Sequence, residues 1–83
     1  HRADGRADEE AKREVGRLVR ERTGQEPQLV KLLWTDVGRV LFLTLEVGAG
    51  KSLSDAHVLA GELEEELRLH IADIADVVVH TEP

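Results

Sequence analysis

The feature that most constrains the fold is a pair of apolar segments in the middle of the chain, separated by Val37-Gly38. Their composition is typical of β-strands, which we expect over Leu29–Asp36 and Arg39–Val47, with Val37-Gly38 as the tight turn of a hairpin. Successive side chains of a strand point to opposite faces of the sheet. One face of the second strand is therefore expected to carry its leucines. The opposite face carries Val40, Phe42, Thr44 and Glu46.

A helix is expected on either side of the hairpin. The first begins at Ala7, ends at Gly24 and is kept from resuming by Pro27. Ser52 has the character of a helix N-cap, with Asp55 three residues later, so the second helix should begin there. Its predicted apolar stripe consists of Leu53, Ala56, Leu59 or Ala60, Leu63 and Leu67.

The second helix is followed by a predicted loop over Ile71–Asp76 and a third strand over Val77–Glu82. The order α-β-β-α-β predicts an α+β, ferredoxin-like (metallochaperone-like) open sheet with two helices on one face. We expect residues 7–83 to form a single domain and residues 1–6 to be a disordered or artificially added N-terminal segment.

Both faces of the predicted hairpin are rich in apolar residues, which is unusual for a sheet covered by helices on one side only. A chain of 83 residues also has a marginal core of its own, burying only about 60–65% of its unfolded surface. These two points predict a partner, most simply a second copy in a two-fold dimer. The alternative is that a few aliphatic side chains stay exposed to water.

Composition excludes several classes of function. With 17 acidic and 11 basic residues the net charge is −6, and Trp34 and Phe42 are the only aromatic residues, so nucleic-acid binding is not expected. There is no cysteine for a disulfide or thiolate site. No apolar run reaches the length of a membrane span, and the chain as given is expected to be soluble. Catalytic motifs are absent too, so we predict no enzyme activity.

The candidate functional residues are histidines and one carboxylate. The two-residue period of a strand places His80 and Glu82 on one face, and His57 lies near the start of the second helix. Nitrogen and oxygen ligands of this kind suit Zn²⁺, and also Mn²⁺, Fe²⁺ or Co²⁺. The alternative is that these side chains are ordinary solvated surface residues, as we expect for His70 and His1.

Three segments carry a resemblance to a known family. They are Ser52-Leu-Ser-Asp-Ala-His57, Glu62-Leu-Glu-Glu-Glu-Leu67 and Ala75-Asp-Val-Val-Val-His80-Thr-Glu-Pro83. Together they resemble the cytoplasmic C-terminal domain of cation diffusion facilitator transporters, which export divalent metal cations. Over Ala7–Val47 the resemblance consists of the order of elements and the hydrophobic pattern.

The resemblance implies a two-fold dimer beneath a membrane domain, on the cytoplasmic face of the cell membrane. It further implies that metal, most simply zinc, binds at the dimer interface through His57, His80 and Glu82. Two further ligand positions of the family differ, because Thr44 and Val30 or its neighbour stand where relatives have histidines. One ion shared by the three remaining ligands, with help from the second subunit, is the site that the resemblance supports.

Three hypotheses about function follow. In the first, the chain is the metal-sensing, dimerising regulatory domain of a divalent metal transporter. In the second, it is a structural dimerisation module that binds no metal. In the third, it is a stand-alone metal-binding protein.

Overall fold

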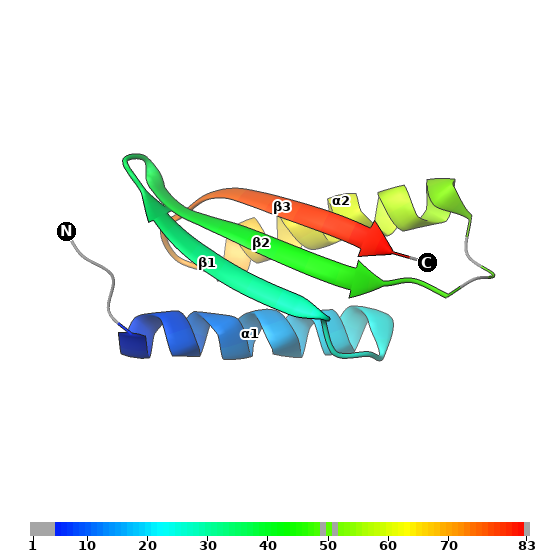
Figure 1. The fold of residues 1–83 in the computed structure, drawn as a ribbon, viewed down its shortest axis with the longest axis horizontal. Coiled ribbons are helices and arrows are strands. Elements are labelled where there is room, and N and C mark those ends of the chain that lie inside the picture. The colour runs from blue at the N-terminus through cyan, green and yellow to red at the C-terminus, as the bar shows by residue number, and fades with distance from the viewer. Residues whose placement is uncertain (1–4, 49, 51, 83) are drawn as a thin grey trace.

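A computed structural model describes residues 5–48, 50 and 52–82 of the chain. It contains α1 (Gly5–Thr23), β1 (Leu29–Thr35), β2 (Gly38–Glu46), α2 (Leu53–His70) and β3 (Ile74–Glu82), in the order that the sequence predicts (Figure 1). The described N-terminal boundary of the first helix is Gly5, two residues before the predicted start. The predictions for residues 1–4, including His1, lie outside the described residues.

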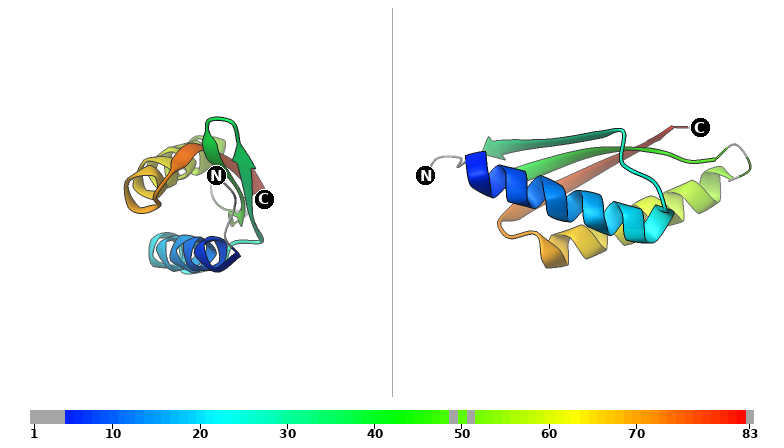
Figure 2. Two further views of the ribbon diagram at one scale, coloured as in Figure 1. Left: turned by 90° about the vertical axis from the view of Figure 1, so that its left-hand side faces the viewer. Right: turned by 90° about the horizontal axis from the view of Figure 1, so that it is seen from below.

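The three strands form one sheet in the order β1-β2-β3. β1 and β2 pair antiparallel as a hairpin, whereas β2 and β3 run parallel and are joined by α2. Both helices cover the same face of the sheet, and the opposite face carries no helix (Figure 2). The predicted α+β, ferredoxin-like open sheet with two helices on one face is therefore confirmed.

The core lies between the sheet and the two helices. The alternate residues Leu41, Leu43 and Leu45 of β2 are at most 2% exposed and point toward the helices, as the two-residue period requires. Each helix contributes an apolar stripe to this core. Their buried members are Ala11, Val15, Leu18 and Val19 of α1 and Ala56, Ala60, Leu63 and Leu67 of α2.

Local signals mark the helix ends as expected. Gly24 takes a positive φ of 77° and its N–H donates to the carbonyl of Arg20, which ends α1. At the start of α2, the Ser52 hydroxyl accepts a hydrogen bond of 3.0 Å from the backbone N–H of Asp55. Both boundaries depend only on neighbouring residues, and for that reason the sequence reveals them.

Three expectations are wrong. The hairpin turn is formed by Asp36 and Val37 rather than by Val37 and Gly38, because Gly38 already pairs with Thr35 in the sheet. β3 begins at Ile74 rather than Val77, because Ile74 pairs with Arg39 of β2 before the register shifts by one residue. Leu53, predicted to belong to the buried stripe of α2, is 86% exposed. It is the first residue of the helix and precedes Ala56, where α2 first contacts the core.

Arg22 of α1 connects the two helices. Its guanidinium donates to Glu62 and Glu66 of α2 at 3.1 and 2.9 Å, and this pairing raises the pKa of Arg22. Because these side chains are exposed to solvent, their contribution to stability is modest. None of the described helices is both long and apolar enough to cross a bilayer.

Candidate functional site

The open face of the sheet is the surface without helices. Strand pairing places its residues in rows across the three strands, with Lys31 beside Phe42 and Val78, and Leu29 beside Thr44 and His80. Its large apolar side chains are only partly covered, because Leu29 is 50%, Leu33 43% and Val78 42% exposed. The apolar second face expected from the sequence is thus present in the fold.

His80 and Glu82 lie together at one end of this open face. The His80 Nε2 and Glu82 Oε2 atoms are 3.6 Å apart, and their side chains are 67% and 49% exposed. The separation is too long for a good hydrogen bond, so two polar groups stand side by side toward solvent. The sequence-based expectation that the two residues share a face is consistent with this geometry.

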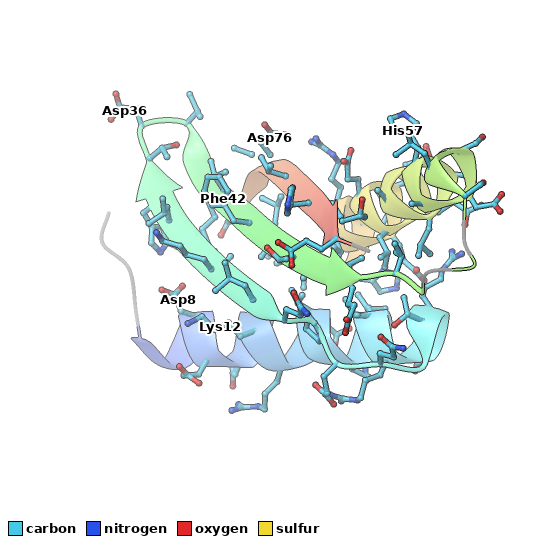
Figure 3. All side chains as sticks on the ribbon, turned by 45° about the vertical axis from the view of Figure 1, so that its right-hand side comes forward. Asp8, Lys12, Asp36, Phe42, His57 and Asp76 are labelled. Carbon is cyan, nitrogen blue, oxygen red and sulfur yellow. The ribbon has the colours of Figure 1, made fainter. Side chains whose placement is uncertain are left out.

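Within one chain, His57 does not join His80 and Glu82. It is exposed near the beginning of α2, and Figure 3 shows it pointing away from the sheet. Within the described ranges, no three side chains of the His, Cys, Asp and Glu types are gathered closely enough to hold a metal ion. His70 is also exposed, and its Nδ1 lies 2.9 Å from the Glu66 carbonyl of its own helix.

Thr44 and Val30, the positions where the resemblance implied histidines in relatives, have different surroundings. Thr44 is the register partner of His80 and so lies next to it on the open face. Val30 is partly buried and packs against the core on the other face, so the open-face position in β1 beside Thr44 is Leu29. Neither Thr44 nor Leu29 has an imidazole, so neither adds a nitrogen ligand beside His80.

Glu46 lies next to the His80–Glu82 pair, although the sequence interpretation did not include it in the site. It is the register partner of Glu82, so two carboxylates stand on adjacent strands at the same end of the open face. Like charges directly opposite in a sheet repel each other, and a bound cation would relieve that repulsion. The alternation of β2 had already assigned Glu46 to this face, but only the register of β2 with β3 brings it to Glu82.

Arg39 is a second residue that the sequence interpretation left out. Its side chain lies on the helix-covered face and is only 7% exposed, with its guanidinium carbon 5.0 Å from the centre of the Trp34 ring. Asp8 of α1 provides the counter-charge at 3.7 Å. The two-residue period of β2 places Arg39 on the same face as Leu41 and Leu43, but the sequence does not identify Trp34 and Asp8 as its partners.

The family model and the solved structures point to the same family. The sequence model of a family described as "Cation efflux protein, cytoplasmic domain" matches residues 32–83. A search among curated proteins found no significant match.

Solved structures extend the likeness over nearly the whole chain. The metal-bound C-terminal domain of the CzcD transporter from Thermotoga maritima is 27% identical, with 92% of this chain and 91% of that chain covered and a TM-score of 0.76. The cytosolic domain of a cation diffusion facilitator family protein is 26% identical, with 96% of both chains covered and a TM-score of 0.81.

A MamM C-terminal domain carrying two substitutions shares the fold at only 13% identity, with a TM-score of 0.84 over 94% of this chain and 95% of that one. The family match spans more than half of the chain, and the architecture agrees with it. The chain therefore belongs to the cytoplasmic domain family of cation efflux proteins, the cation diffusion facilitators.

Proposed function

We propose that this chain is the regulatory and dimerisation domain of a divalent metal cation transporter and senses metal at the interface between two copies. In that role it lies on the cytoplasmic face of the membrane, with the membrane domain of the same transporter as its partner. The observation that carries the proposal is the His80–Glu82 pair on the open face, in a chain of the cation efflux family.

The spacing of the pair suits one metal ion. Two ligand atoms on a tetrahedral zinc, each bonded at about 2.0–2.1 Å, lie roughly 3.3 Å apart. The 3.6 Å between His80 Nε2 and Glu82 Oε2 needs little adjustment to reach that value. Imidazole and carboxylate together favour zinc, and they also accept manganese, iron or cobalt.

A pair is not a complete zinc site, which needs three or four protein ligands. His57 is exposed near the start of α2, but it points away from the sheet of its own chain (Figure 3). A second copy related by two-fold symmetry can present its own His57 to the His80–Glu82 pair. Dimerisation and metal binding then depend on each other.

Electrostatics gives the mechanism. Each copy carries a net charge of −6, and Glu46 and Glu82 stand side by side at the proposed interface. Without metal, the two copies repel one another there. A bound divalent cation neutralises the carboxylates and links the copies, which shifts the population toward a closed dimer.

The test is a calorimetric titration of the 83-residue chain with zinc and with manganese, combined with small-angle scattering. We expect saturable zinc binding with compaction, and loss of at least tenfold in affinity in both His80→Ala and His57→Ala. His70→Ala is the matched control, since His70 is exposed on the same helix as His57 and should leave binding unchanged. Equal zinc affinity in the His80→Ala variant would reject the site.

The apolar open face favours a second candidate, a dimerisation module that binds no metal. Leu29, Leu33 and Val78 are each at least 42% exposed there and would be covered by a second copy. Sedimentation separates the two candidates, because a purely structural dimer is indifferent to a chelator and is disrupted by Leu33→Glu. A metal-linked dimer dissociates when the chelator removes the ion.

A further inference from the structure

The end of the molecule opposite the His80–Glu82 pair contains a cleft of about 420 Å³. The molecule is elongated, with extents of 44 × 20 × 18 Å, and this end brings together the β1–β2 hairpin, the turn between α2 and β3, and the start of α1 (Figure 1). The lining of the cleft includes Trp34, Asp36, Val37, Gly38, Asp73 and Ile74.

Backbone contacts hold the two walls of the cleft in place. The Arg39 N–H donates to the Asp73 carbonyl at 3.0 Å, which ties the hairpin to the turn before β3. The walls approach so closely at Gly38 that an added Cβ would lie 3.2 Å from the Asp73 carbonyl oxygen. A cleft that is already formed spares a ligand the cost of ordering it.

The hairpin tip has an unusual composition for a turn. Val37 is 80% exposed at a position where glycine, asparagine or aspartate is typical. The Thr35 hydroxyl donates to the Gly38 carbonyl at 2.8 Å and accepts from the Val37 N–H at 3.3 Å, so the turn that displays Val37 is fixed. An apolar side chain is thereby held out at the mouth of the cleft.

The rim of the cleft is acidic. Asp36 is at the hairpin tip (Figure 3) and Asp73 is in the turn before β3, and both are exposed. In the described part of the chain, neither carboxylate forms an ion pair. The walls behind them are formed by the indole of Trp34 and by Ile74. Apolar walls beneath two carboxylates suit a lysine or arginine side chain, whose aliphatic stem packs while its charged end pairs.

We infer that this hairpin-end cleft binds a basic, apolar peptide segment. The identity of this peptide segment rests on the proposed function, in which the chain belongs to a membrane transporter. Cytoplasmic loops of membrane proteins carry an excess of lysine and arginine. A basic loop of the transporter's membrane domain is therefore the partner whose charge complements Asp36 and Asp73. Metal is bound at one end of the domain and the membrane domain contacts the other.

The experiment uses the ¹⁵N-labelled 83-residue chain with a chelator present and an acetylated five-residue peptide of alternating arginine and leucine. Amide shifts are expected to concentrate at Thr35–Gly38 and 73–75, together with the indole N–H of Trp34. Asp36→Asn combined with Asp73→Asn should weaken binding about fivefold at low salt. The matched control, Glu64→Gln with Glu65→Gln, removes the same charge from α2 and should leave affinity unchanged.

Equal weakening by both double variants would show general attraction to an acidic protein and overturn the inference. Shifts confined to α2 or the open face would overturn it as well, and so would binding to anionic lipid vesicles with no binding to the peptide. Because the chelator is present throughout, a failure here leaves the zinc proposal standing. A failed zinc titration, in turn, does not affect the peptide result.

Discussion

At the scale of single residues, Arg39 shows how one buried charge organises one end of the domain. Its Nε and Nη1 atoms, and Oδ1 of Asp8, are buried and make no hydrogen bond to any described residue. The guanidinium is stabilised instead by the Trp34 ring and by the 3.7 Å ion pair with Asp8. Because the buried Arg39 charge has so few partners, the stability of the domain should fall when any of them is removed.

Removing Asp8 tests that sensitivity. We expect Asp8→Ala to lower the free energy of unfolding by about 1–3 kcal/mol, because Arg39 then stays buried without its counter-charge. Urea denaturation measures the change. Glu9→Ala is the control, since it removes the same charge from the same end of α1 at an exposed position. A double variant that combines Asp8→Ala with Arg39→Met should recover part of the lost stability. If Asp8→Ala lowered the free energy of unfolding no more than Glu9→Ala does, the account would be contradicted.

At the scale of elements, the boundaries known from sequence are those set by local chemistry. Gly24 ends α1 and Ser52 begins α2 because a positive φ and an N-cap hydroxyl are properties of those residues. The start of β3 depends on distant pairing with Arg39, and no local signal distinguishes Ile74–Asp76 from a loop. The same limit applies to Glu46, whose place beside Glu82 follows from a register that no local pattern specifies.

The N-cap of α2 provides a prediction at this scale. Ser52→Ala removes the acceptor for the Asp55 N–H and should lower the free energy of unfolding by about 1 kcal/mol. Ser54→Ala is the comparison, because Ser54 is exposed within the first turn and alanine favours a helix. Chemical denaturation of the two variants side by side measures the difference. Equal stability of the two variants would mean that the cap does not contribute.

At the scale of the whole molecule, the two proposals place one site at each end of the domain. The ends of β2 and β3 carry Glu46, His80 and Glu82, and the hairpin end carries the acidic cleft. The two-residue period of a strand was enough to predict that His80 and Glu82 share a face. No property of one chain predicts whether His57 joins them, because the answer depends on how two copies pack.

The most direct measurement is anomalous X-ray scattering at the zinc edge, from crystals of this chain grown with zinc. The account predicts an anomalous peak within bonding distance, about 2.0–2.2 Å, of His80 Nε2 and a Glu82 carboxylate oxygen, with His57 of a second copy as a further ligand. An ion bound elsewhere, or a dimer whose His80–Glu82 pair holds no zinc, would contradict it.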